Sequence, residues 1–422
     1  MLKNTIISWL GGNMFTFFKV KKVAEVLEEI TKFPMLPEES LGLKEALGRY
    51  LAKDILAKED LPPFSRATMD GYAVYARDTF GARESEPVIL KIKGEIAMGE
   101  VPSFSLASGE AARIATGGML PEGADAVVML EYTEEEKGII EVKRPVAPYE
   151  NVIFKGEDFE KGTIVFPAGI KITPAVIGVL SGLGITQVEV GQRPKVGILS
   201  TGDELVLPEK ELPLGKIRDI NSYTLYSASL ESGAIPTLYG IVPDVKEKLF
   251  VKVEKAIQEN DVLLISGGSS VGTRDFTLEA ISRLPEAELI CHGVAVKPGK
   301  PTILGQVGSK AIFGLPGQVA SALLIFYIMV RPLLLHMQGA KGEHLFLRKI
   351  MAYAARNIPS TPGREDYVRV KLSFSEKGVI ALPILKKSGL ISSMAEAHGF
   401  LRIPENSEGI YEGELAEVFL LP

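Results

Sequence analysis

Helical spacing of apolar residues marks the start of the chain. Between Lys19 and Lys32 the apolar side chains share one helical face, namely those of Val20, Val23, Ala24, Leu27 and Ile30. A second helix is predicted over 42–57, where similar spacing recurs at Leu43, Ala46, Leu47 and Leu51. Pro62 and Pro63 then end the helical pattern, since proline removes a backbone donor and clashes with the preceding turn.

From Pro62 to about Pro148 the pattern changes to short apolar runs separated by turns. The runs expected to be strands are Val88–Ile92, Ala111–Ile114, Ala126–Leu130 and Ile139–Val142. Such a series predicts a compact β domain. Between Ile164 and Val190 glycine turns alternate with apolar runs, and we expect this segment to rejoin the domain that the first helices begin. The β domain is therefore predicted to be an insertion.

A βαβ pattern begins after Arg193-Pro194 and predicts an α/β domain. Its expected strands are Val196–Ser200, Ile235–Val242 and Val262–Ile265, with a helix near Ser222–Glu231. Asp244 is expected to be the N-cap of a further helix, which carries Leu249, Val253 and Ile257. A long apolar helix closes this unit near Met337. From about Gly339 the pattern is β again, with alternation over Tyr367–Leu372, and predicts a small barrel or sandwich.

The predicted fold class is α/β plus β in several domains, because one hydrophobic core does not grow to this chain length. The limits that we predict are 1–61 with 150–191 for the first domain, 62–149 for the inserted β-rich domain, 192–338 for the doubly wound α/β domain and 339–422 for the C-terminal β domain. No internal repeat interrupts this series.

Composition narrows the class of protein and of partner. The chain has 422 residues, of which 46% are hydrophobic and 24% charged, as in a soluble globular protein. A net charge of −6 argues against a nucleic-acid partner. Cys291 is the only cysteine, so no intrachain disulfide forms, and four histidines make a zinc cluster improbable. Any metal is expected to be a hard ion on carboxylates, or an oxyanion.

Two apolar stretches bear on the location of the protein. Ile6–Phe18 is broken by glycines and lacks a small-residue cleavage site, which argues against a secretory signal, and Met14 is an alternative start. Val319–Val330 is followed at once by Arg331-Pro332, too early for a membrane span. We therefore expect a buried helix there, a cytoplasmic protein and no membrane partner.

The stretch Asp261–Thr277 has the pattern of an anion site. A strand leads into a turn that contains Gly267, Gly268, Ser269, Ser270 and Gly272, and a helix is expected to start near Asp275. Glycines let successive backbone N–H groups face an anion, and a helix N-terminus adds to the attraction. An ordinary turn between strand and helix gives the same pattern, so both readings stay open on this stretch alone.

Charged residues follow several of the predicted strands. The carboxyl ends of parallel strands meet at one edge of a sheet, where ligands bind. The residues expected to converge there are Asp203, Glu204, Ser269, Asp275, Lys297 and Lys300. These motifs contain two lysines, three carboxylates and backbone donors, but no histidine base or cysteine nucleophile. Such a set is suited to binding a polyanion together with a divalent cation.

Three loops outside this sheet also carry polar residues in unusual positions. Asp70 lies in Ser65–Tyr72, Thr116 follows a predicted strand in Arg113–Gly118, and Asp158 ends the loop that begins at Lys155. Taken singly, each of these loops is explained as well by a solvated turn.

Taken together and in order, the motifs resemble those of a known family. The segment PPFSRATMDGYA that begins at Pro62 is similar to the signature of the molybdopterin molybdenumtransferases, the MoeA and gephyrin E-domain family. The segments RIATGGMLP, LSTGDEL, SGGSSVGTRDFT, KPGKP and GLPG follow in the same order as in that family. The resemblance extends from about Lys19 to the C-terminus.

The resemblance implies a fold, a reaction and a set of site residues. The fold would have an elongated domain, the inserted domain, the molybdopterin-binding α/β domain and a C-terminal β-barrel. The reaction would insert molybdate into adenylylated molybdopterin and release AMP with Mg²⁺. The implied catalytic residues are Asp70, Thr116, Asp158, Glu204, Asp244 and Asp275. Asp203, Glu204 and Asp275 would bind the metal, and further substrate contacts would come from Lys297, Lys300, Pro316, Arg364 and Ser392 beside the glycine loop.

The resemblance also implies a homodimer in which each site lies between the α/β domain of one chain and the inserted domain of the other. The adenylyltransferase of the same pathway is a possible further partner. The chain departs from the family pattern at Gln318-Val319, where Asn-Pro is usual, and at His292-Gly293, where another lysine is common. Tungstate remains an alternative to molybdate. A molybdopterin adenylyltransferase and a non-catalytic molybdopterin-binding scaffold remain alternative functions.

Overall fold

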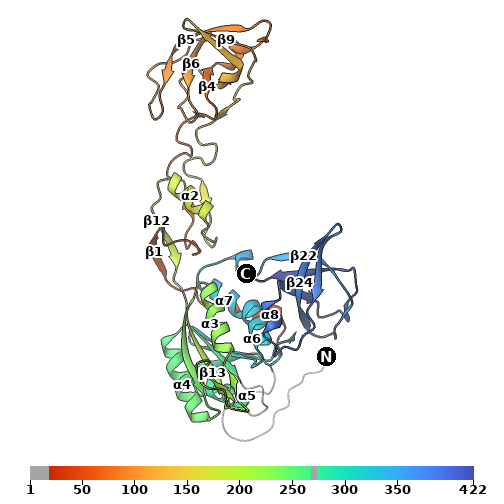
Figure 1. Cartoon of the computed structure of the whole chain (residues 1–422). Coiled ribbons are helices and arrows are strands. Elements are labelled where there is room, and N and C mark those ends of the chain that lie inside the picture. The colour runs from red at the N-terminus through yellow and green to blue at the C-terminus, as the bar shows by residue number, and fades with distance from the viewer. Residues whose placement is uncertain (1–18, 268–272) are drawn as a thin grey trace, which may run out of the picture.

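The computed structural model describes residues 19–267 and 273–422, except for the side chains of 273–275. The chain forms an elongated molecule with four parts (Figure 1). A β-sheet built from residues 71–142, here called the inserted sheet, lies at one end, and a narrow linking region follows it. An α/β region forms the other end, with a C-terminal barrel beside it.

The α/β region is built on a six-stranded sheet. Its strand order is β16-β13-β17-β21-β20-β18, and the first four strands are parallel. The strands are β13 (Lys195–Thr201), β16 (Ile235–Val242), β17 (Val262–Gly267), β18 (Ala287–His292), β20 (Ile303–Val307) and β21 (Lys310–Leu315). β18 and β20 run antiparallel at one edge. The predicted doubly wound sheet is confirmed, and the antiparallel edge adds to it.

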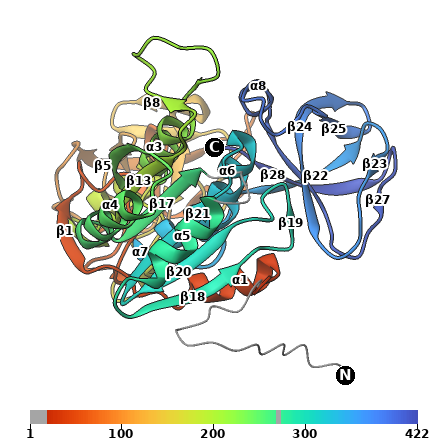
Figure 2. The ribbon, with the colours of Figure 1, turned by 90° about the horizontal axis from the view of Figure 1, so that it is seen from below.

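Helices cover both faces of this sheet (Figure 2). α4 (Lys246–Glu259) and α5 (Thr273–Ser282) pack on one face. The core on the other face includes α1 (Val23–Ile30), α3 (Asn221–Glu231), α6 (Val319–Ile325) and α7 (Arg331–Met337). A π-helical turn, Phe326–Val330, joins α6 to α7. Among the described helices, Val319–Met337 alone has the length and hydropathy of a membrane span, and most of it is buried in this core.

The inserted sheet has the order β7-β4-β6-β5-β9-β8. Its strands are β4 (Gly71–Val74), β5 (Val88–Ile96), β6 (Glu110–Ile114), β7 (Ala126–Met129), β8 (Thr133–Glu136) and β9 (Ile139–Val142), with short 3-10 helices at Ala76–Thr79 and Leu130–Tyr132. All four residues of β4 are buried, because separate hydrophobic cores cover the two faces of the sheet. The predicted strands in this segment are confirmed within a few residues at their ends.

The linking region is made from two stretches that are far apart in sequence. β1 (Glu38–Gly42) pairs with β12 (Gln187–Gly191), and β2 (Ile55–Leu56) pairs with β11 (Ile164–Phe166). α2 (Pro174–Gly182) packs beside them, and β3 (Arg66–Ala67) pairs with β10 (Val152–Ile153) where the chain enters and leaves the inserted sheet.

The helix predicted over 42–57 is wrong. The segment folds into turns and short bridges, with Gly48 at a φ of 79°. Ala46 and Leu51 are buried as the pattern requires, but Leu47 is 53% exposed. The apolar residues pack against α2 and β12 rather than along a helix of their own. The pairing that decides this conformation comes from residues more than a hundred positions later.

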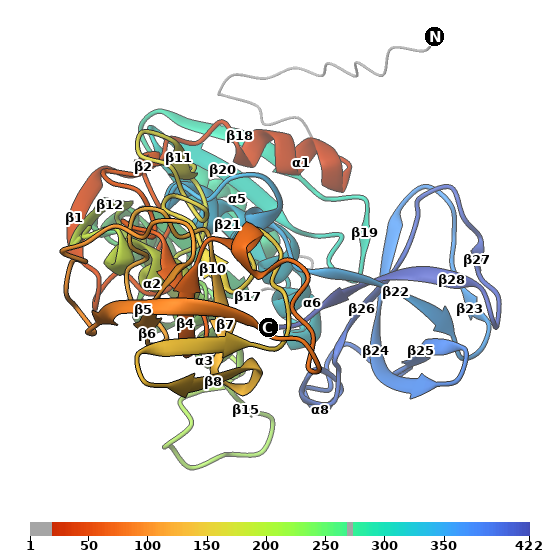
Figure 3. The same ribbon diagram turned by 90° about the horizontal axis from the view of Figure 1, so that it is seen from above.

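The C-terminal barrel is closed. Its strands follow the order β24-β25-β22-β28-β26, and β26 pairs back with β24. They are β22 (Lys349–Ala354), β24 (Glu365–Ser375), β25 (Gly378–Pro383), β26 (Gly399–Ile403) and β28 (Leu415–Leu420). The short strands β23 (Ile358–Pro359) and β27 (Gly409–Ile410) pair beside it, and Figure 3 shows the barrel to one side of the α/β region. A barrel, rather than a sandwich, is therefore the fold.

Candidate functional site

A cavity of about 320 Å³ opens at the carboxyl edge of the α/β sheet. Residues from β17, β21 and the loops that follow β19 (Val296–Lys297) and β21 line it, together with one barrel residue. Of the residues singled out in the sequence, it is lined by Gly267, Lys297, Lys300, Pro316 and Arg364. Since these five residues come from four separate stretches of chain, it is the fold that brings them together.

Gly267 ends β17 at the cavity, where it contacts the neighbouring strand. Its φ is 142°, and a Cβ at this position would lie 2.1 Å from the carbonyl oxygen of Thr201. No side chain fits at that distance, so glycine is needed for β13 and β17 to end side by side. The sequence-based expectation of close backbone approach at this glycine agrees with the geometry.

Three cations lie around the cavity. Lys297 ends β19, Lys300 is on the loop that follows, and Arg364 precedes β24 of the barrel. The loop lies tightly against α6, since a Cβ on Gly299 would be 2.6 Å from Ile325 Cδ1. Positive groups held on a stiff loop at the end of parallel strands attract an oxyanion or a phosphate.

The carboxylates lie beside the cavity, at the ends of β13 and β16. Asp244 accepts a hydrogen bond from Thr201 Oγ1 at 2.9 Å, and its backbone N–H donates to Asp203 Oδ1 at 3.2 Å. Glu204 folds back over Gly202, so that a Cβ there would meet its carboxylate at 2.6 Å. Asp244 is not the N-cap that the sequence predicted, because α4 begins at Lys246 and its N-cap is Val245. Its carboxylate contacts Thr201 instead.

Few side chains in the described part of the chain are placed to bind a metal ion together. No group of three or more histidine, cysteine or acidic side chains comes close enough there to hold a metal. Mg²⁺ commonly takes only one or two carboxylates and completes its shell with waters and substrate phosphates. Asp203 and Asp244 suit such a partial shell, in which a bound phosphate supplies the remaining oxygens.

Part of the predicted site lies outside the described residues. This applies to Gly268, Ser269, Ser270 and Gly272, and to the side chain of Asp275. The expected helix after the glycine loop is α5, and Asp275 falls in its first turn.

Asp70, Thr116 and Asp158 lie far from the cavity of the same chain. Asp70 precedes β4 and Thr116 follows β6, and Figure 1 places these strands at the opposite end of the molecule from β13. Asp70 Oδ1 accepts a hydrogen bond from the backbone N–H of Thr116 at 2.6 Å. This bond, with a second from the Thr116 side chain, lowers the pKa of Asp70. Asp158 is exposed, between β10 and β11.

A loop of the C-terminal region contacts one of the residues that line the cavity. Ser392 begins the short helix α8 (Ser392–Ala395) and is exposed. Four residues earlier, the carbonyl of Ser388 accepts a hydrogen bond from Ala320 N at 3.1 Å, which ties this loop to the start of α6. Gln318, where the sequence departs from the family pattern, lines the cavity and contacts Ser388 Oγ. His292, at the other departure, lies in β18.

The sequence analysis missed two residues that contact the lining of the cavity. Asn221 Nδ2 donates to Ser266 Oγ at 2.6 Å and to the Gly317 carbonyl at 2.9 Å, and so joins the end of β17 to the loop that follows β21. Asp366 is buried and pairs with both Lys297 and Arg364. An asparagine beside a predicted helix start gives no local signal, and the pairing of Asp366 depends on a contact between the barrel and the α/β region.

Three family models match the chain in succession. The MoeA N-terminal region, domains I and II, matches residues 20–184. A probable molybdopterin binding domain matches 197–336, and the MoeA C-terminal region, domain IV, matches 351–421. These segments include the inserted sheet, the cavity and the barrel.

Relatives match over nearly the whole length. A putative molybdopterin biosynthesis protein of Methanocaldococcus jannaschii is 38% identical, with 95% of each chain covered. A molybdopterin molybdenumtransferase of Bacillus subtilis is 33% identical, with 94% of each covered. The crystal structure of a MoeA protein from Pyrococcus horikoshii matches with a TM-score of 0.79 at 34% identity, over 96% of this chain and 100% of that one. The chain therefore belongs to the MoeA family of molybdopterin molybdenumtransferases.

Proposed function

We propose that the chain is a molybdopterin molybdenumtransferase, which takes adenylylated molybdopterin and molybdate, or tungstate, and releases AMP. This step belongs to molybdenum cofactor biosynthesis, the pathway of the family. The observation that carries the proposal is the cavity in which Lys297, Lys300 and Arg364 surround the carboxyl edge of the sheet. A phosphorylated pterin and an oxyanion both need such a set of cations.

The reaction balances without an oxidant or a reductant. Two Mo–S bonds form as the dithiolene sulfurs replace two oxygens of molybdate, which leave as two waters with the two thiol protons and two protons from solvent. One water is consumed when the phosphoanhydride bond breaks and AMP departs. Molybdenum keeps its oxidation state. The protein then has to position two anions against their mutual repulsion, and fixed cations in a partly enclosed site do this.

Mg²⁺ is part of the proposal. When bound, it would neutralise charge on the phosphates and polarise the anhydride. Asp203 and Asp244 would hold it by one or two oxygens, with Glu204 and Asp275 as further candidates. Residues of this chain do the remaining work: Lys297 and Lys300 bind anionic oxygens, and Arg364 offers a planar donor edge from the barrel.

We also propose a homodimer, with Asp70, Thr116 and Asp158 of one chain completing the site of the other. The support is the distance between these residues and the cavity within one chain (Figure 1). Ser392 and Pro316 would line the substrate path, and the glycine loop would bind phosphate. The adenylyltransferase of the pathway is a candidate partner, and a cytoplasmic location belongs to the same proposal.

The domain limits 1–61 with 150–191, 62–149, 192–338 and 339–422 are proposed with it. Separate hydrophobic cores in the linking region, the inserted sheet and the barrel support them. α1 is an exception, since it packs into the core of the α/β region. Limited proteolysis should cut near 62 and 149 before it cuts within either sheet.

The alternative functions are not favoured. An adenylyltransferase would need only the α/β region, whereas the family match covers the inserted sheet and the barrel as well. A molybdopterin-binding scaffold would use the same cavity, but relatives that match over most of the chain are named as molybdenumtransferases.

The experiment that tests the proposal is AMP release. The protein is incubated with adenylylated molybdopterin, Mg²⁺ and molybdate, and AMP is measured by chromatography. We expect release that depends on the oxyanion and stops when EDTA removes Mg²⁺. Formation of pyrophosphate from ATP and molybdopterin would indicate the adenylyltransferase instead, and tight binding without turnover would indicate a scaffold.

A further inference from the structure

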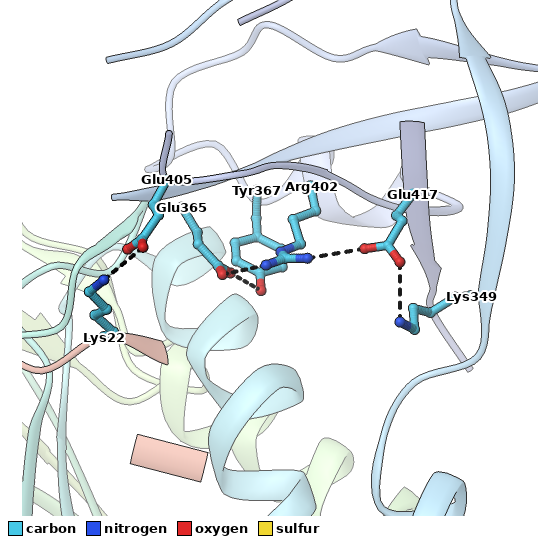
Figure 4. A network of polar contacts seen from close by, with 7 residues as sticks. All are labelled: Lys22, Lys349, Glu365, Tyr367, Arg402, Glu405 and Glu417. Atoms are coloured by element: carbon cyan, nitrogen blue, oxygen red, sulfur yellow. Dashed lines mark hydrogen bonds and ion pairs between the residues drawn. The ribbon is translucent and has the colours of Figure 1, made fainter. Parts of the chain in front are cut away.

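The start of β24 presents different residues to its two sides. β19 pairs with β24 in parallel, and Lys297 is the register partner of Asp366. Side chains alternate along a strand, so Arg364 and Asp366 belong to the side of Lys297 and the cavity. Glu365 and Tyr367 belong to the other side, where Figure 4 shows them with Arg402. The β19–β24 pairing also joins the α/β region to the barrel.

Asp366 lies between two of the cavity's cations. Its carboxylate is 3.3 Å from Lys297 Nζ and 3.0 Å from Arg364 Nε, and its side chain is only 4% exposed. Asp366 does not itself line the cavity, but both of its partners do. A carboxylate this buried is stable only when it is paired, so the contacts fix all three groups.

From this geometry we propose that Asp366 is a positioning residue for the oxyanion. The proposal rests on the function proposed above. Arg364 pairs with Asp366 through Nε, which leaves its two Nη groups uncommitted to Asp366 for a bidentate contact with a tetrahedral oxyanion. Lys297 is held at the same time, although its side chain is 54% exposed. One buried barrel carboxylate thus sets the spacing of two cations that come from different regions.

The positioning role predicts a change in anion affinity opposite to the change that charge alone predicts. A carboxylate close to an anion site repels the anion, so removing its charge should tighten binding if electrostatics decide. If positioning decides, removal should weaken binding, because Lys297 and Arg364 lose their fixed geometry. The two effects therefore predict opposite changes in affinity.

The test compares Asp366→Asn with Glu365→Gln in the full-length protein. Glu365 is the adjacent residue of the same strand, so its side chain points to the other side. It accepts hydrogen bonds there from Arg402 at 2.6 Å and from Tyr367 at 2.7 Å (Figure 4). Both variants lose one buried or half-buried carboxylate. Molybdate binding is measured by titration calorimetry at fixed ionic strength, with thermal unfolding of each variant recorded beside it.

We expect the Kd for molybdate to rise about tenfold in Asp366→Asn and to change less than about twofold in Glu365→Gln. Asp366→Glu keeps the charge but moves it by one methylene, and it should weaken binding to an intermediate degree. This variant also serves if Asp366→Asn does not fold. Equal or tighter binding by Asp366→Asn, or parent affinity in Asp366→Glu, would overturn the positioning role. If the parent chain bound neither molybdate nor tungstate, the proposed function would fail, and this inference with it.

Discussion

At the scale of single residues, the two lysines of the cavity loop differ in their surroundings. Both side chains are exposed, but Lys297 pairs with the buried carboxylate of Asp366, whereas Lys300, three positions later, has no ion pair within the described part of the chain. Each adds a positive charge to the same cavity. Their separate contributions to anion binding can therefore be measured by removing one charge at a time.

Replacing Lys297 or Lys300 with methionine should weaken the binding of molybdate by about tenfold at low ionic strength, because a charged hydrogen bond is lost. The difference from the parent should shrink as salt is added, since the lost interaction is screened. Calorimetric titrations over a series of salt concentrations measure both effects. Affinities that match the parent at every salt concentration would contradict the role of these lysines.

Gly267→Ala should disturb the end of the sheet and reduce turnover. Its Cβ would overlap the Thr201 carbonyl oxygen, so β13 and β17 would have to separate, at a cost of about 1–3 kcal/mol in stability for the strained backbone alone. Gly308→Ala is the matched control, because Gly308 also has a positive φ, 56°, but no atom lies within 4 Å of its Cβ position.

Gly308→Ala should lower the free energy of unfolding by about 1–2 kcal/mol and leave turnover unchanged. Chemical denaturation and AMP release distinguish the two variants. Equal turnover in both would mean that the close approach at Gly267 has no bearing on the site.

At the scale of elements, α1 packs against the α/β region and carries ion pairs with the residues just before and after it. Val23, Val26 and Ile30 are buried in the core. Glu29 on the same helix pairs with Lys21 at 2.6 Å and with Lys32 at 2.8 Å. These hydrogen bonds, that from Lys21 first, lower the pKa of Glu29 to about 2.

Glu29→Gln should reduce stability in a way that depends on pH. The pKa of Glu29 is lower in the folded chain than its ordinary value of 4.5, so the ionised carboxylate favours folding above that value. The benefit is lost as the pH falls from about 4.5 towards 2. We expect the variant to be less stable than the parent by about 1 kcal/mol or less at pH 7, because the pairs are partly exposed.

Urea denaturation of both chains at pH 7, 5, 4 and 3 checks this prediction. The gap between parent and variant should be constant down to pH 5 and then close. A gap that widened on acidification would show that the sign is wrong.

Elements were predicted correctly from the sequence where the spacing of apolar residues within the segment is enough to indicate its conformation. Val262–Ile265, unbroken in apolar residues, is a buried parallel strand, and Ser222–Glu231 is helical within one residue. The segment 42–57 failed because its apolar residues pack against partners from a distant stretch of chain. The same distinction holds for the residues of the site. Lys297 and Lys300 are recognisable within their own motif, whereas Asp366 gains its role only through the β19–β24 pairing.

At the scale of the whole molecule, the inserted sheet and the cavity lie at opposite ends (Figure 1). Substitutions at the two ends therefore test whether sites are shared between chains. Asp70→Ala and Lys297→Ala should each strongly reduce AMP release at limiting molybdate when every chain carries the substitution. In a heterodimer of the two variants, one shared site would hold both substitutions and the other neither.

Co-expression with two different affinity tags isolates that heterodimer. We expect it to recover about half of the parent activity if sites form between chains. Sites built within one chain would give no recovery. As a control, light scattering measures the oligomeric state of the parent at the assay concentration. A monomeric parent would exclude sites shared between chains.

The connectivity of the linking region has a consequence for the order in which the chain is made. Glu38–Gly42 leaves the ribosome well before its partner Gln187–Gly191, and α1 packs against α7, which is made later still. The inserted sheet, by contrast, pairs strands from the contiguous residues 71–142 alone, and its two cores add the flanking buried residues Ala67, Val146 and Val152. Domains generally fold as units during synthesis. The inserted sheet can therefore be complete while β1 of the linking region still lacks its partner β12. We expect the inserted sheet to form before the linking region that carries it.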